Sequence, residues 1–136
     1  MEEDSITPER IDELLRFLPL FDVPGREFIE KWAGGEKTRD GAIIRPYPVY
    51  PQDVKDFYHL AGQDCWSDYD YEPQGASKML QDDEFIRTAT VENIKTMLTY
   101  CVRGERFCDG VWAEMLRSGR IVAILKRLQV LKGQGE

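Results

Sequence analysis

Apolar residues recur every three or four positions along most of this chain, which is the spacing of one buried face on an α-helix. The clearest run has six apolar residues on one helical face, namely Val91, Ile94, Met97, Leu98, Cys101 and Val102. A second long run has five such residues, namely Ile121, Ile124, Leu125, Leu128 and Leu131. Thr90 precedes the first run, and its hydroxyl oxygen is expected to cap that helix by accepting a hydrogen bond from the first turn. The pattern predicts two long helices near the carboxyl end.

Shorter helical patterns occupy much of the remaining chain. They begin at or next to Pro8, Asp22, Pro51, Gln74, Asp82 or Asp83, and Asp109. Thr7 and Pro8 make a typical helix start, and Pro19 is expected to end that helix. The second helix is expected to turn four apolar residues inward, namely Phe28, Ile29, Trp32 and Ala33. Gly34 and Gly35 would then close it.

Residues 36–50 break the helical pattern. Asp40-Gly41 is a typical tight-turn pair, and residues 42–44 form the most strand-like run of the chain. Pro46 and Pro48 exclude a central strand, because proline cannot donate a hydrogen bond to a neighbouring strand. We expect one small β-hairpin near residues 36–45, or an extended arm.

These elements predict a mainly α, compact single-domain bundle of about six or seven helices. At 136 residues the chain has room for one core, so residues 1–136 are taken as one helical domain with frayed ends at 1–6 and 132–136. Nine residues are predicted to lie in the core: Leu14, Leu18, Trp32, Phe57, Leu98, Trp112, Ile121, Leu125 and Leu128.

Charge is unevenly distributed along the sequence. The net charge is −7, which argues against nucleic-acid binding because that binding depends on neutralising phosphates. Residues 1–90 hold 10 basic and 20 acidic side chains, whereas residues 91–136 hold 8 basic and 5 acidic ones. Such a gradient can attract a second copy, giving a homo-oligomer, or an acidic protein partner. The more common interpretation of this asymmetry is a solvated surface without a specific role.

The cysteines and the apolar runs bear on location and cofactors. Cys65, Cys101 and Cys108 are odd in number and are expected to be reduced. With His59 they have the ligand count for zinc, but they lack the close ligand pairs of zinc sites, so neither a metal nor a cofactor is predicted. No apolar run is long enough to span a membrane, and the acidic start is unlike a signal peptide, so a cytoplasmic location is expected.

The junction between two predicted helices, residues 103–112, is one candidate site. Arg103, Glu105, Arg106 and Asp109 balance in charge there. Gly104 is expected to end the preceding helix and Asp109 to cap the following one. The favoured interpretation is a structural clasp, in which the arginines bind carbonyl groups and the two acids. The alternative is an arginine pair that binds a phosphate or carboxylate ligand.

The acidic, aromatic segment 63–73 is the other candidate. Its residues of interest are Trp66, Asp68, Tyr69, Asp70 and Tyr71. Such a loop suits a cationic ligand, an arginine-rich segment or a hydroxyl-rich small molecule. The structural interpretation is an irregular loop whose aromatic side chains pack on the core, while its acids stay in solvent or meet one of the junction arginines.

No catalytic motif accompanies these candidates. The chain has no phosphate-binding glycine motif, no nucleophile elbow and no paired-histidine metal motif. We therefore favour a cytoplasmic, non-catalytic binding or protein-interaction module. The alternative is a small-molecule enzyme or sensor with an anion-binding arginine pocket between the 63–73 loop and the 103–112 junction.

Several motifs resemble one family. They include FLP near residue 17, PYP-x-Y at 46–50, CWSDYDYEP at 65–73 and TMLTYCVRGERFCDG at 96–110, followed by the closing helix to residue 131. In these the chain is similar to small prokaryotic proteins known only as a domain of unknown function. The resemblance implies a free-standing domain and supplies no activity, cofactor or catalytic residue.

Overall fold

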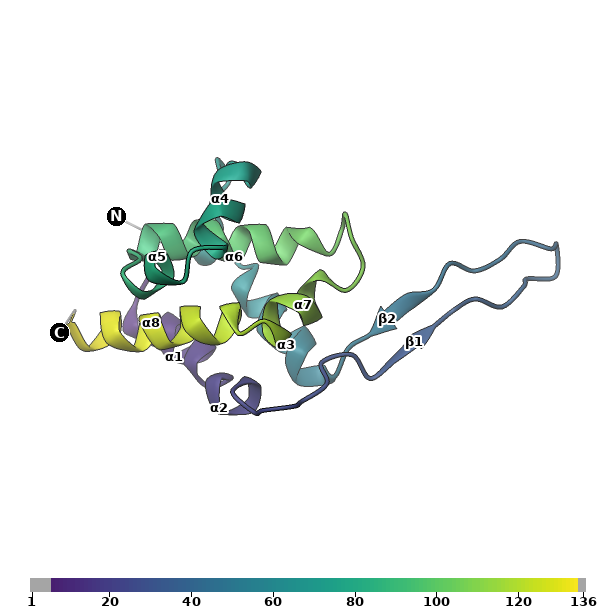
Figure 1. The fold of residues 1–136 in the computed structure, drawn as a ribbon, viewed down its shortest axis with the longest axis horizontal. Coiled ribbons are helices and arrows are strands. Elements are labelled where there is room, and N and C mark those ends of the chain that lie inside the picture. Colours follow the sequence, from purple (N-terminus) through teal and green to yellow (C-terminus); the bar gives the residue numbers. More distant parts are fainter. Residues whose placement is uncertain (1–5, 135–136) are drawn as a thin grey trace.

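Two long helices, α6 (Val91–Gly104) and α8 (Arg120–Gln134), form the framework of the computed structural model, which describes residues 6–134. Figure 1 shows them as two neighbouring layers, with the other helices packed around them. Those helices are α1 (Pro8–Leu15), α2 (Leu18–Phe21), α3 (Gln52–Ala61), the 3₁₀ turn η1 (Asp64–Trp66), α4 (Pro73–Leu80), α5 (Asp83–Arg87) and α7 (Val111–Arg117). The prediction of a mainly α bundle in one domain is confirmed.

Side-chain caps explain where several helices begin. The Thr7 hydroxyl oxygen accepts a hydrogen bond from the Arg10 N–H at 3.3 Å, which starts α1. Thr90 and Asn93 exchange hydrogen bonds at 3.1 Å in both directions at the start of α6, so the predicted cap is confirmed. Pro19 does not end the first helix as predicted. It lies in the first turn of α2, where a proline costs no hydrogen bond.

The core lies between α1, α3, α6 and α8. Six of the predicted core residues are fully buried, namely Leu14, Phe57, Leu98, Ile121, Leu125 and Leu128. Leu18 and Trp112 are partly buried against this core. Trp32 was predicted wrongly, because 55% of it is exposed.

The error at Trp32 comes from the segment before it. Residues 22–30 contain no helix, and Trp32 lies in strand β1 (Lys31–Ala33). Gly25 turns the chain with φ +77°, a left-handed conformation that a helix interior does not accept. Gly34 also has positive φ, and a Cβ there would lie only 2.6 Å from the Arg45 carbonyl oxygen. The glycines therefore belong to a turn and a close strand approach, not to the end of a helix.

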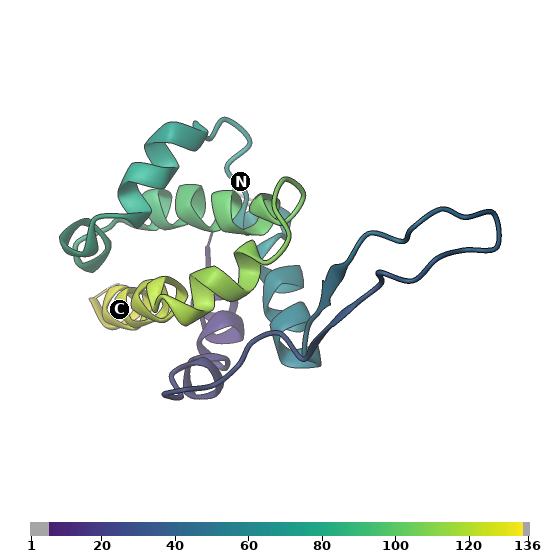
Figure 2. The ribbon, with the colours of Figure 1, turned by 45° about the vertical axis from the view of Figure 1, so that its right-hand side comes forward.

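An arm, residues 30–49, projects away from the helices (Figures 1 and 2). Strand β1 pairs antiparallel with β2 (Tyr47–Val49), with Trp32 opposite Pro48. Further out, Lys37 and Ile43 form a single bridge around the turn that contains Gly41. The predicted hairpin is therefore confirmed, and it extends well beyond residues 36–45.

The two ends of the described chain lie on the side away from the arm. Helix α8 continues to Gln134, past its predicted end at residue 131. Residues 1–5 and 135–136, which belong to the ends predicted to fray, lie outside the described residues. None of the described helices is both long enough and apolar enough to cross a membrane.

Candidate functional site

The junction between α6 and α7 is built around glycines and one carboxylate. Gly104 is the last residue of α6, and a Cβ on it would lie 2.7 Å from Cγ1 of Val111. It is therefore needed for close packing of the two helices. It ends α6 as predicted, but without the positive φ of a left-handed helix end. The left-handed residue is Gly110, with φ +96°, which stands at the N-cap position of α7.

Glu105 takes the capping role that was predicted for Asp109. Its carboxylate accepts hydrogen bonds from the backbone N–H groups of Gly110 and Trp112, both at 2.9 Å. These are free amide groups of the first turn of α7, where a negative charge is favourable. Asp109 is exposed, and its side chain makes no hydrogen bond or ion pair within the described residues. The acid that lies four residues closer to α6 reaches the turn because Gly110 folds the chain back towards it.

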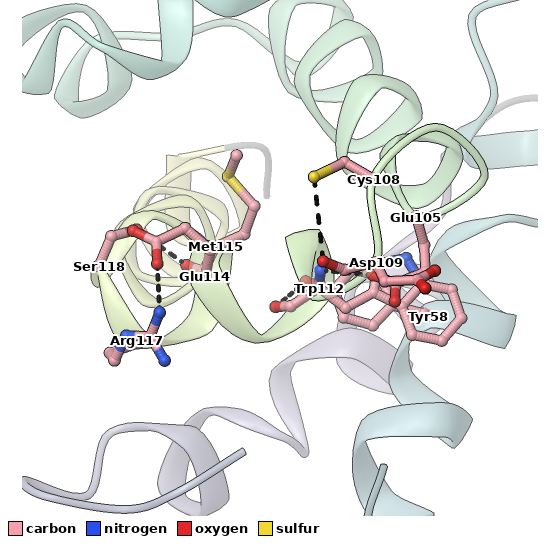
Figure 3. A network of polar contacts seen from close by, with 9 residues as sticks. All are labelled: Tyr58, Glu105, Cys108, Asp109, Trp112, Glu114, Met115, Arg117 and Ser118. Carbon is pink, nitrogen blue, oxygen red and sulfur yellow. Dashed lines mark hydrogen bonds and ion pairs between the residues drawn. The ribbon is translucent and has the colours of Figure 1, made fainter. Parts of the chain in front are cut away.

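Aromatic side chains complete the junction (Figure 3). The Tyr50 hydroxyl donates a hydrogen bond to Glu105 at 2.9 Å, and burial together with Glu105 raises the pKa of Tyr50. The Tyr58 ring stacks on Trp112 with centroids 4.5 Å apart, and the Tyr58 hydroxyl donates to the Trp112 carbonyl at 3.0 Å. These contacts form a structural clasp, and Glu105 rather than an arginine is its centre.

Neither arginine of the junction takes part in this clasp. The guanidinium of Arg103 lies 5.2 Å from the ring centre of Tyr71 and 5.9 Å from that of Tyr69. Arg106 is exposed. Within the described residues, no ion pair joins either arginine to a carboxylate. The 63–73 loop therefore does meet the junction, but through tyrosine rings and not through acids.

The acids of the loop are held elsewhere. Asp68 accepts a hydrogen bond from the Thr96 hydroxyl at 2.6 Å, and its backbone N–H donates to Thr99 at 2.8 Å. Tyr69 donates to Asp64, and Asp70 is exposed. These bonds fix the loop along α6, so that its aromatic rings stand beside Arg103.

Trp66 differs from the other candidates because it is completely buried. It forms part of the main hydrophobic core, and its indole N–H has no hydrogen-bond partner there. Its burial agrees with the structural interpretation of the 63–73 loop, in which aromatic side chains pack on the core.

A cavity of about 200 Å³ lies where the loop and α6 meet. Its lining includes Arg103, Arg106, Tyr69, Ser67 and Thr99. Arg103 and Arg106, which were both predicted as site residues, therefore line the same cavity. Because no carboxylate of residues 6–134 pairs with them, their N–H groups suit an anionic ligand.

A larger cavity, of about 620 Å³, lies at the base of the arm. Its lining includes Glu27, Glu30, Trp32, Asp109 and Glu114, together with Lys31, Cys108 and Arg117. Figure 3 shows that Arg117 is paired with Glu114. Of the predicted site residues only Asp109 lies here. Trp32 was predicted to lie in the core and not in this cavity, because its spacing from Phe28 also fits one face of a helix.

The described residues show little sign of metal or thiol chemistry. No group of three or more histidine, cysteine or acidic side chains is arranged to hold a metal ion in this part of the chain. Cys65 and Cys101 are buried, and burial raises the pKa of Cys101 to about 12, so its thiol stays protonated. Cys108 is exposed, at the rim of the larger cavity.

Comparison with known proteins places the chain in a family without assigning it an activity. A model of a family of unknown function, DUF6508, matches residues 6–134. No curated protein matches the chain, and no solved structure does. The match covers all the described helices and the arm, which agrees with the resemblance inferred from the sequence motifs. The chain belongs to the DUF6508 family, a family of unknown function.

Proposed function

We propose that this protein is a non-catalytic protein-interaction module and that the arm is the element that contacts its partner. The observation that carries the proposal is the position of apolar side chains. Four large apolar residues of the arm are exposed, namely Trp32, Ile43, Ile44 and Tyr47. Large apolar groups that stay exposed on a projecting element are typical of interaction surfaces.

The edges of the arm add to this argument. A two-stranded ribbon has two outer edges whose backbone groups have no partner within the ribbon. Pro46 and Pro48 lack the N–H that pairing along the β2 edge would need. The β1 edge has no proline and is the edge better suited to contact another protein.

The base of the arm is held firmly against the helices. Before β1, Arg26 makes a two-point ion pair with Asp53 of α3, with both distances 2.8 Å. After β2, Tyr50 is bound to Glu105 through its hydroxyl. Both ends of the arm are thus fixed to the body, which reduces the entropy lost when a partner binds.

Site-specific photo-cross-linking in the native cells tests the proposal. The photoreactive amino acid p-benzoylphenylalanine would replace Ile43 in the arm, or Val130 of α8 as a control that is also exposed. We expect discrete cross-linked products from position 43, each identified by mass spectrometry, and none from position 130. Equal labelling from both positions, or no product from the arm, would contradict the proposal.

A cytoplasmic location is part of the same proposal. Three cysteines without disulfide bonds support a reducing compartment. Cell fractionation followed by thiol labelling without reductant tests it. Labelling of Cys108 in the cytoplasmic fraction is expected, and recovery of the protein with exported proteins would contradict it.

A second candidate function is a small-molecule sensor or enzyme that uses the cavity beside Arg103 and Arg106. Two guanidinium groups that pair with no carboxylate in the described part of the chain favour an anionic ligand in this cavity. The test is the thermal stability of the protein with inorganic phosphate or citrate. Arg106→Ala should abolish any ligand-induced rise in Tm while leaving the Tm of the free protein unchanged, and Arg45→Ala serves as the control. No rise in Tm for the native chain, or an equal rise in the Arg106→Ala variant, would count against this candidate.

A further inference from the structure

The larger cavity at the base of the arm is a groove with an apolar lining. Ile29 and Val111 are partly buried there, whereas Trp32 is 55% exposed. The indole ring of Trp32 reaches to the start of α7, where a Cβ on Gly110 would lie 4.0 Å from its Cη2 atom. The ring therefore bridges the arm and the helical body, and more than half of it remains in contact with water.

The charged residues of the groove carry an excess of negative charge. Six of them line it, namely the acids Glu27, Glu30, Asp109 and Glu114 and the bases Lys31 and Arg117. Arg117 is paired with Glu114, so these two charges cancel. The other four side chains make no hydrogen bond or ion pair with any of residues 6–134. Three unpaired acids therefore face one unpaired lysine, and the groove favours a cation.

The start of α7 does not offset this preference. The backbone N–H groups of Gly110 and Trp112 already donate to Glu105, and that of Val111 donates to the Cys108 carbonyl at 3.3 Å. The amide groups that would attract an anion are therefore occupied. A metal ion does not suit the groove either, because no three acidic, histidine or cysteine side chains among the described residues are arranged to hold one. An organic cation fits better.

A guanidinium group matches both kinds of surface in the groove. It is planar, so it can stack on the indole of Trp32 while its N–H groups donate to carboxylates. An ammonium group can contact the same ring, but it is more strongly hydrated and lacks the fork that binds a carboxylate at two points. Arginine is therefore the side chain that the groove fits best.

We propose that this groove docks an arginine-bearing segment of a partner protein, with the guanidinium over Trp32 and its N–H groups directed to the acids around it. This inference rests on the proposed function, because it names the chemistry of the arm's partner. Most of the charged lining residues are exposed, so a small cation would leave much of its own surface in water. A protein that contacts the arm would cover the groove in the same step.

Contacts on both sides hold the groove in shape before a partner binds. On the side of the arm, Ile29 packs against the core, and Arg26 is paired with Asp53 of α3. On the side of α7, Glu105 fixes Gly110 through a hydrogen bond of 2.9 Å. A groove that is already formed loses little entropy when it is filled.

Selection of peptides against the full chain tests the inference. The probe is a phage library of random linear peptides, and the enriched peptides should share an arginine. Replacing that arginine by citrulline, which has nearly the same shape but no charge, should raise the Kd at least about tenfold in fluorescence anisotropy. The affinity should also fall with increasing ionic strength, because the acids of the groove are exposed.

Variants of the chain locate the binding site of the selected peptide. Glu30→Gln and Trp32→Ala should each weaken binding about three- to tenfold. Lys31→Gln removes the unpaired base of the groove and should strengthen binding about twofold or more, an effect that damage to the fold would not produce. Glu36→Gln is the matched control, because Glu36 is an exposed acid of the arm that does not line the groove, and it should have no effect.

Several results would overturn the inference. They are the enrichment of no peptide, enriched peptides without arginine, an affinity that citrulline leaves unchanged, and equal effects of Glu30→Gln and Glu36→Gln. Cross-links from position 43 of the arm would then still support the proposed interaction function. Arginine-dependent binding in the groove without any cross-link from position 43 would instead count against the arm as the contact element. The two proposals can therefore fail separately.

Discussion

The helical body and the arm use apolar residues in opposite ways. In the body, Leu125 and Leu98 are fully buried, and the surrounding helices leave them no contact with water. In the arm, Ile43 and Trp32 are 65% and 55% exposed. The same residue types therefore stabilise the fold in one region and form a surface in the other. The reason is that a two-stranded ribbon has no second layer to cover it, so its apolar groups remain available to a partner.

The largest expected effect comes from a cavity in the body. Leu125→Ala should lower the free energy of unfolding by about 2–5 kcal/mol, because it removes a fully buried side chain between packed helices. Urea denaturation followed by circular dichroism measures the loss. A loss well below about 1 kcal/mol would show that α8 is not central to the core.

The next largest loss of stability should come from the clasp between the body and the base of the arm. Glu105→Ala leaves two N–H groups of α7 and the Tyr50 hydroxyl without their acceptor, which should cost about 2–3 kcal/mol. Tyr50→Phe removes only one of these bonds and should cost about 1 kcal/mol. Equal losses in the two variants, measured by urea denaturation, would mean that the helix cap contributes nothing.

Acid should loosen the ion pair at the base of the arm. Hydrogen bonds from Arg26 hold the pKa of folded Asp53 below its ordinary value. As the pH falls, Asp53 is therefore protonated in the unfolded chain before it is protonated in the folded protein. The contribution of Asp53 is therefore fully present above about pH 4 and is lost as the pH falls through the folded pKa. The pair is partly exposed, so Asp53→Asn should cost at most about 1 kcal/mol at neutral pH and nothing in strong acid.

The measurement for this pair is the stability of Asp53→Asn and of native protein between pH 2 and 7. Asp70→Asn is the matched control, because Asp70 is exposed and its side chain makes no ion pair with any of the described residues. The native and Asp53→Asn curves should converge as the pH falls. Curves that stay parallel would show that the Arg26 contact does not lower the pKa of Asp53.

The smallest expected effect on stability is at the tip of the arm. Ile43→Ser should change the free energy of unfolding by less than about 0.5 kcal/mol, because Ile43 is already mostly in contact with water. The same change should weaken photo-cross-linking from p-benzoylphenylalanine that replaces Tyr47. A loss of stability comparable to that of Leu125→Ala would mean that the arm belongs to the core after all.

Local signals in the sequence predicted much of the body correctly. Thr7 and Thr90 start helices because their caps depend only on residues three positions away. The apolar spacing after Thr90 and Gly119 predicted the two framework helices for the same reason, since each face repeats within a few residues. The Asp40-Gly41 turn was likewise a local prediction, and Gly41 has the positive φ it requires.

The errors occur where the outcome depends on distant residues. The spacing of Phe28 and Trp32 fits a helix face, but pairing of Trp32 with Pro48 places it in a strand. Arg103 and Arg106 were balanced by nearby acids in the sequence, yet the acid at position 105 turns to α7 and Tyr50. The sequence therefore indicated the two candidate segments, 63–73 and 103–112. It did not indicate which of their side chains meet.

The helical class, the main helix starts, the hairpin turn and most of the core could be predicted from the amino-acid sequence, because these features follow from spacing and capping within a few residues. Three features required the tertiary structure: Glu105 caps α7, Arg103 lies beside tyrosine rings, and Trp32 is exposed beside an acidic cavity. Those outcomes depend on which distant groups share a space. Local sequence allows many such contacts equally well. Hydrogen bonding of buried polar groups and close packing in the folded protein determine which of them form.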